Sequence, residues 1–128
     1  EIARKNDFKV VCFIAPTTTD QRVSLITQKA QGFLYYISVV GITGIRDKLP
    51  DDIIQNINKL KQMTNIPVAV GFGVSTSEHA KLIGTVADGV IVGSAIMREI
   101  EKYAKEPSEE LVRGVGEFVG QLISGAKG

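Results

Sequence analysis

The stretch Pro67-Val68-Ala69-Val70-Gly71-Phe72-Gly73-Val74-Ser75 decides the fold class. Its apolar run over 67–70 does not alternate with polar residues, which is typical of a strand buried on both faces of a parallel sheet. Glycines follow at once, and Ser75 with Glu78 predicts a capping box for a helix that continues through Ala80 and Ile83. The stretch therefore predicts a strand, a glycine turn and a helix, which together form one unit of a parallel α/β fold.

The same order recurs along the chain. Apolar runs over 10–14, 33–37 and 89–92 predict three further strands. Helical spacing predicts helices over 20–30, with Thr18 and Gln21 as a capping box, over 51–63 and 95–105, and from Pro107 onward. Strict alternation implies parallel strands with right-handed crossovers. We therefore predict a single α/β domain over 1–128, either a four-stranded open sheet or four strand–helix units of a TIM (βα)8 barrel.

Composition excludes several classes of function. The chain has 128 residues and a formal net charge of +1, so it lacks the concentrated basic face that nucleic-acid binding requires. Cys12 is the only cysteine and His79 the only histidine, which excludes an internal disulfide and a structural zinc site, and we expect no metal. No apolar run is long enough to span a bilayer and no signal peptide is visible, so we expect no membrane partner and a cytoplasmic location, or an organelle after removal of a targeting segment.

The first six residues read as the last turn of a helix, and no initiator Met precedes them. We therefore expect a piece of a longer chain. A half-barrel leaves two exposed strand edges, which predicts that the segment self-associates or is held in a longer chain.

Two glycine-containing helix starts follow neighbouring strands. Gly71-Phe72-Gly73 precedes one predicted helix, and Gly93-Ser94 opens the short helix after the last strand. Glycine lets a backbone approach an anion closely, and a helix start offers unpaired N–H groups. Two such loops after adjacent strands predict a site for a phosphate ester, although a tight turn also uses Gly and Ser.

The segment 38–50 is long and apolar enough to act as a lid rather than as a solvated connector. General acid–base catalysis needs a group that reaches the reacting atom, but no acidic residue stands at the immediate end of any predicted strand. The nearby carboxylates are interpreted as helix caps or surface charges rather than as catalytic groups; they are Asp20, Asp47 and Glu78. The residues alone thus predict a phosphate-binding segment without an obvious catalytic pair.

Four segments resemble the tryptophan synthase alpha chain, in that family's order and spacing. They are Phe13-Ile14-Ala15-Pro16-Thr17 and the residues 35–44, 70–75 and 88–96. The resemblance covers essentially the whole chain but only the carboxyl-terminal half of the family's barrel. It implies a lyase of tryptophan biosynthesis that cleaves indole-3-glycerol phosphate in a retro-aldol reaction to indole and glyceraldehyde 3-phosphate.

The resemblance also implies roles for individual residues. The substrate phosphate would be bound by backbone N–H groups of Gly44, Gly73, Gly93 and Ser94. The indole pocket would be lined by Ile14, Tyr35, Phe72 and Ile91. Thr43 would support a catalytic aspartate from the lid. Val39 stands where many relatives carry Arg, which removes a charge contact.

The family's catalytic Glu and Asp belong to the amino-terminal half, so the resemblance predicts that this segment is inactive alone. It implies no cofactor here, because pyridoxal phosphate belongs to the beta chain, the partner in an alpha2beta2 heterotetramer. A non-catalytic phosphate-binding half-barrel module and another phosphate-barrel isomerase are the alternatives.

Overall fold

A computed structural model describes residues 2–38, 49, 52–71 and 73–128. The strands are β1 (Cys12–Ile14), β2 (Leu34–Ile37), β3 (Val68–Gly71) and β4 (Gly89–Val90); the helices are α1 (Ile2–Lys5), α2 (Asp20–Thr27), α3 (Ile53–Met63), α4 (Ser77–Gly84), α5 (Ser94–Lys102) and α6 (Ser108–Lys127). Strand and helix alternate as the sequence predicts, and the short α5 follows the last strand. None of these described helices is both long and apolar enough to cross a bilayer.

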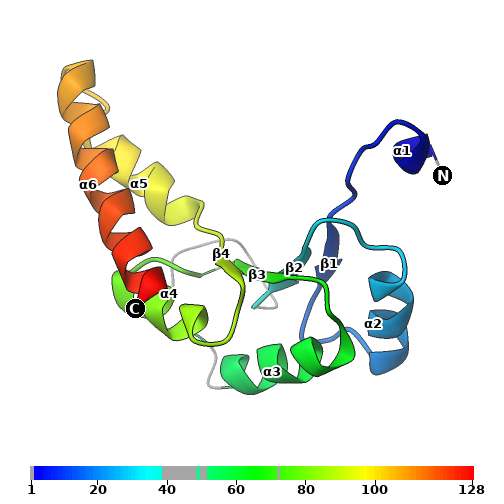
Figure 1. The fold of residues 1–128 in the computed structure, drawn as a ribbon. Helices are drawn as coiled ribbons and strands as arrows, with labels where there is room; N and C mark the ends of the chain where they lie inside the picture. The colour runs from blue at the N-terminus through cyan, green and yellow to red at the C-terminus, as the bar shows by residue number, and fades with distance from the viewer. Residues whose placement is uncertain (1, 39–48, 50–51, 72) are drawn as a thin grey trace.

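The strands form one parallel sheet in the order β1-β2-β3-β4 (Figure 1). Phe13 pairs with Tyr35, Tyr35 with Ala69, and Ala69 with Gly89. Successive side chains of a strand point to opposite faces, so these four residues share one face of the sheet. Their neighbours Ile14, Tyr36, Val70 and Val90 share the other.

The helices of the described residues cover one of these two faces. In Figure 1, α2, α3 and α4 lie on the same side of the sheet, and none of the described helices lies across the opposite face. The core forms between the sheet and these helices, and its fully buried side chains are Leu34, Ile53, Ile57, Ile83, Val68 and Val70. Packing against one face only is the arrangement expected of consecutive units of a (βα)8 barrel, whose helices form an outer ring. We call the uncovered side the open face.

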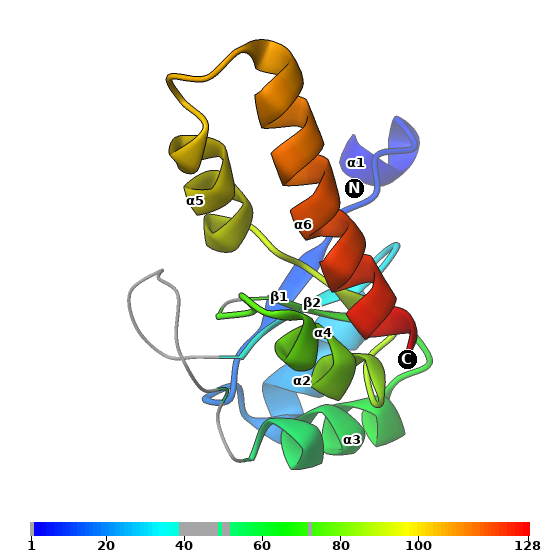
Figure 2. The same ribbon diagram turned by 90° about the vertical axis from the view of Figure 1, so that its left-hand side faces the viewer.

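The helices α4 and α6 pack with their backbones in close approach. A Cβ at Gly125 would lie 2.4 Å from the carbonyl oxygen of Ser77, and one at Gly84 would lie 2.5 Å from that of Ala126. Both views show α4 against the carboxyl-terminal end of α6 (Figures 1 and 2). Glycine at these two positions therefore sets how closely the two helices approach.

The helix caps differ from those that the sequence predicts. Thr19, not Thr18, caps α2 by accepting from the Arg22 N–H, while Thr18 Oγ1 accepts from the Ala15 N–H. Thr76, not Ser75, caps α4 by accepting from the His79 N–H at 3.2 Å. Both predicted capping boxes are wrong by one residue, because each region offers adjacent hydroxyl residues that satisfy the same cap pattern.

Asp88 ties the amino-terminal edges of β3 and β4 together. Its carboxylate accepts from the Val68 N–H at 2.8 Å and from Lys61 Nζ at 2.7 Å. These contacts, the Lys61 ammonium foremost, lower the pKa of Asp88. Because the folded protein favours the charged form, Asp88 adds stability above the usual pKa of an aspartate.

We expect this stabilisation to disappear as the pH falls through the lowered pKa of Asp88. Asp88→Asn keeps an acceptor for the Val68 N–H but removes the charge, so its free energy of unfolding should fall less steeply in acid. Asp88→Ala also orphans that N–H and should cost about 1 kcal/mol at neutral pH. Urea denaturation at several pH values measures both effects. Parallel wild-type and Asp88→Asn curves would contradict the assignment.

Candidate functional site

The loops that follow β3 and β4 leave the sheet at the same edge. Val70 pairs with Val90, and the Ile91 N–H donates to the Val70 carbonyl at 2.8 Å. Gly73 and Gly93 each lie three residues beyond these paired positions, on adjacent strands. The two glycines that the resemblance assigns to phosphate are thus placed at the carboxyl edge of the sheet, where parallel α/β folds bind ligands.

The amino-terminus of α5 is open. Gly93 occupies the N-cap position, and neither a side-chain cap nor an acidic residue is present in the first turn. Ser94 is the first helical residue and is exposed, and a Cβ at Gly93 would meet no heavy atom within 4 Å. The first N–H groups of a helix lack intrahelical partners and carry the positive end of its dipole, so this end suits an anion.

The amino-terminus of α4, unlike that of α5, is capped by a side chain. Thr76 caps its first turn, and Glu78 lies within that turn. The sequence predicts a capped start for this helix, and the structure confirms a cap, one residue later than predicted. Gly73 instead belongs to the loop before α4 and has φ +86°, a conformation that glycine adopts without the penalty of a side chain. Gly73 therefore offers a loop backbone rather than a helix end at this edge of the sheet.

The indole-pocket candidates divide between the two faces of the sheet. Tyr35 lies on the open face, and Ile91, two residues beyond Gly89, continues the same face. Ile14 is in register with Tyr36, is 3% exposed, and packs into the core on the helix side. The structure therefore brings Tyr35 and Ile91 to one face and puts Ile14 on the other.

Phe13 is the aromatic side chain of β1 that meets Tyr35, with ring centroids 5.0 Å apart. It is 57% exposed, which is high for a phenylalanine. The apolar pattern of the sequence does not distinguish Phe13 from the other residues of its run. Once the strand register is known, the alternation of side chains along β1 identifies it.

The carboxyl end of β2 is fixed beside that of β3. The buried Ser38 donates to the Gly71 carbonyl through both its N–H at 3.2 Å and its Oγ at 3.0 Å. The ring of Tyr35 lies across β3, because Gly71 carries no side chain there: a Cβ at Gly71 would lie 2.1 Å from Tyr35 Oη. Partial burial raises the pKa of Tyr35, so its hydroxyl stays protonated at neutral pH.

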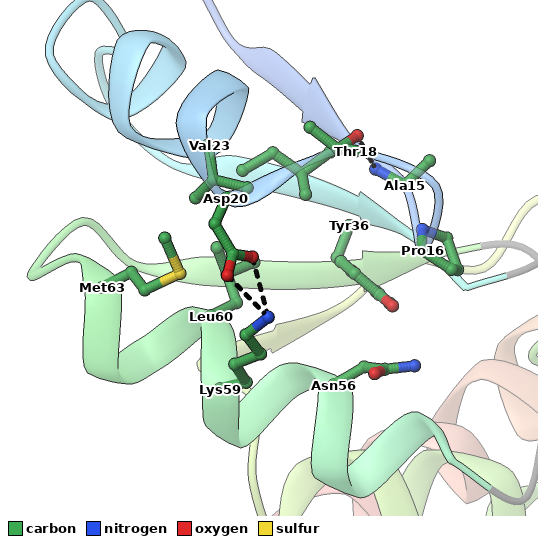
Figure 3. Close-up of a pocket in the computed structure, with 11 residues that line it drawn as sticks. Ala15, Pro16, Thr18, Asp20, Val23, Tyr36, Asn56, Lys59, Leu60 and Met63 are labelled. Carbon is green, nitrogen blue, oxygen red and sulfur yellow. Dashed lines mark hydrogen bonds and ion pairs between the residues drawn. The ribbon is translucent and has the colours of Figure 1, made fainter.

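A cavity of about 70 Å³ lies on the helix side of the sheet, between α2 and α3 (Figure 3). It is lined by Ile14, Tyr36, Asn56 and the ion pair of Asp20 with Lys59 Nζ at 2.7 Å, among others. Burial, followed by the charge of Asp52, raises the pKa of Tyr36 to about 12. This cavity is separated by the sheet from the face that carries Tyr35.

Two of the three carboxylates considered in the sequence are described, and both are engaged locally. Asp20 pairs with Lys59. The pKa of the exposed Glu78 is lowered by its own backbone N–H and by the hydroxyl residues of the α4 cap, so it is ionised at neutral pH.

Within the described ranges, no three His, Cys, Asp or Glu side chains gather closely enough to hold a metal ion. Thr43, Gly44, Asp47 and Phe72 lie outside the described residues, as does Val39.

Comparison with known proteins agrees with this architecture. A family model described as tryptophan synthase alpha chain matches residues 1–126. The tryptophan synthase alpha chain of Chloroflexus aurantiacus is 39% identical over 124 residues, an alignment that covers 97% of this chain and 46% of that protein. The chain thus spans about half the length of the curated relatives that it matches.

Solved structures give the same result. The alpha chain from Legionella pneumophila superposes with a TM-score of 0.79 at 30% identity, covering 97% of this chain and 44% of that one. The A-subunit from the hyperthermophile Pyrococcus furiosus gives a TM-score of 0.73 at 37% identity, covering 93% and 48%. The four parallel strands correspond to part of a TIM barrel, which settles the choice between an open sheet and a barrel segment. The chain belongs to the tryptophan synthase alpha chain family.

Proposed function

We propose that this chain supplies the phosphate-binding and indole-binding loops of a tryptophan synthase alpha-type lyase, which cleaves indole-3-glycerol phosphate to indole and glyceraldehyde 3-phosphate. The observation that carries the proposal is the open amino-terminus of α5 at Gly93 and Ser94, beside the loop in which Gly73 has φ +86°. Backbone N–H groups at this edge of the sheet suit a doubly charged ester group.

The open face supplies the complementary apolar surface. Tyr35, Ile91 and Phe13 lie on it, so a flat aromatic ring bound there has its phosphate directed to the carboxyl edge of β3 and β4. Phe72 and Gly44 extend the same two subsites in our proposal, and Thr43 supports the catalytic aspartate.

We assign the chemistry itself to carboxylates from the other half of the barrel. A general acid or base must reach the reacting atom, and Asp20 is paired with Lys59 on the far side of the sheet. A catalytic Glu and Asp from the amino-terminal half complete the site in this proposal. The indole then passes to a beta chain that carries pyridoxal phosphate, and the chain needs no cofactor of its own.

Mixing this chain with the amino-terminal half of the Chloroflexus aurantiacus relative tests the proposal. Indole release from indole-3-glycerol phosphate should occur in the mixture and in neither half alone. Binding of the phosphate ester without turnover would favour a non-catalytic phosphate-binding module instead. A mixture that neither binds nor cleaves the ester would contradict both functions.

Substitution of Ser94 tests the phosphate subsite in that mixture. Ser94→Asp places a negative charge at the open end of α5 and should raise KM for the ester by about 10- to 100-fold, since each factor of ten corresponds to about 1.4 kcal/mol. The same charge interacts favourably with the helix dipole, so thermal stability should not fall. Ser94→Ala keeps the N–H and should leave KM within a few-fold of wild type. Equal KM values for the two variants would contradict the subsite.

A further inference from the structure

Gly73 lies between two fixed points of the loop that joins β3 to α4. Before it, the Gly71 carbonyl accepts from both the N–H and the Oγ of Ser38. After it, Val74 is 4% exposed and belongs to the hydrophobic core. Gly73 itself has φ +86°, and glycine has more backbone freedom than any other residue. The contacts of its neighbours therefore decide the direction in which the Gly73 N–H points.

The Ser75 side chain connects this loop to the first turn of α4. Its Oγ lies 3.4 Å from Nδ1 of His79, and both residues are half-buried. The backbone N–H of His79 also donates to Thr76 Oγ1 at 3.2 Å. His79 thus contacts two consecutive residues of the loop, one through its ring and one through its backbone. Because Ser75 follows Gly73 by two residues, the ring contact restrains the loop on its α4 side.

We propose that His79 is a positioning residue for the phosphate ester. Through the Ser75 hydroxyl, its ring holds the loop so that the Gly73 N–H faces the open end of α5. In this arrangement the Ser75 O–H donates to Nδ1, and the neutral ring carries its proton on Nε2. His79 contacts neither the ester nor the reacting atoms in this role. The inference rests on the proposed function, because it concerns the same phosphate subsite.

Preorganisation is the physical reason for an effect on affinity. A loop that is already held in its binding conformation does not lose further conformational entropy when the ester binds. Without the ring contact, part of the binding energy must order the residues after Gly73. The same loss applies to the bound substrate and to the transition state, so it weakens binding and leaves the chemical step unchanged.

Two substitutions of His79 test the inference in the mixture with the amino-terminal half of the Chloroflexus aurantiacus relative. His79→Phe keeps a ring but removes Nδ1, and should raise KM for indole-3-glycerol phosphate by about 3- to 10-fold at unchanged kcat. Inhibition by inorganic phosphate should weaken by the same factor. His79→Asn places an amide atom close to the position of Nδ1 and should restore KM to within about twofold of wild type.

Two further variants separate positioning from general damage to α4. Ser75→Ala removes the other partner of the same contact, so it should raise KM by the same factor as His79→Phe, and the double variant should be no weaker than either single one. Lys81→Phe is the control, because Lys81 is exposed and residues two apart on a helix do not face each other. Its KM should equal that of wild type. A variant that only reduces the folded fraction lowers kcat and leaves KM as it is.

The outcomes distinguish this inference from the proposed function. Cleavage of the ester by the wild-type mixture, with an unchanged KM in His79→Phe, would overturn the inference and leave the proposed function intact. A KM for His79→Asn as high as that of His79→Phe would also overturn it, because the lost contact would not be the hydrogen bond to Ser75. A lower kcat at unchanged KM would reduce His79 to a structural residue. A wild-type mixture that does not bind the ester would contradict the proposed function and the inference together.

Discussion

Gly125→Ala should lower the free energy of unfolding by about 1–3 kcal/mol, although alanine is the better helix former. The new Cβ would lie 2.4 Å from the carbonyl oxygen of Ser77, and that oxygen belongs to the backbone of α4 and cannot turn aside. The two helices must separate, and the core side chains Ile83 and Leu122 between them lose contact. Urea denaturation at a fixed protein concentration measures the effect.

Gly120→Ala is the matched control on the same helix. A Cβ at Gly120 would meet no heavy atom within 4 Å, so only the helix propensity changes. This substitution should raise the free energy of unfolding by about 0.5–1 kcal/mol. The same chemical change, five residues apart, is thus expected to have opposite signs. Stabilisation by both substitutions would show that α4 and α6 do not approach as closely as the structure places them.

Leu34→Ala should destabilise the chain by about 3–4 kcal/mol, because it removes a fully buried side chain from the second strand of the sheet and leaves a cavity. Leu34 is 0% exposed, and its strand is held by neighbours on both sides. The surrounding structure has little freedom to collapse around the gap.

Leu25→Ala makes the same chemical change on α2, where the side chain is 59% exposed. Its effect on the free energy of unfolding should stay within about 0.5 kcal/mol. Thermal and urea denaturation of both variants under one set of conditions gives the comparison. A cost for Leu34→Ala close to that of Leu25→Ala would mean that β2 does not lie in the core.

The fold could be predicted from sequence because its signals are local. The apolar runs place the four strands to within one or two residues, and helical spacing places α3 and α6 equally well. The predicted caps of α2 and α4 are each wrong by one residue, because two hydroxyl residues are adjacent at both helix starts: Thr18 with Thr19, and Ser75 with Thr76. Only the geometry of the turn selects which hydroxyl accepts the hydrogen bond from the backbone N–H.

The candidate site could be predicted only in part. Glycine and serine after adjacent parallel strands already place Gly73, Gly93 and Ser94 at one edge of the sheet. The face of each strand residue depends on register, and no sequence pattern sets the register of a strand that is apolar throughout. The resemblance implies that Ile14 and Tyr35 line one pocket, whereas the register places Phe13, not Ile14, on the face of Tyr35.

The position of Asp88 has a bearing on how this scaffold could be redesigned. Its carboxylate joins the amino-terminal ends of β3 and β4, while Gly73 and Gly93 lie beyond the opposite ends of the same two strands. Under the proposed function, sequence changes made to accept a different phosphorylated compound would fall on loops that do not carry this carboxylate contact. Libraries varied at the loops around Gly73 and Gly93 should tolerate many more substitutions than libraries that include residue 88.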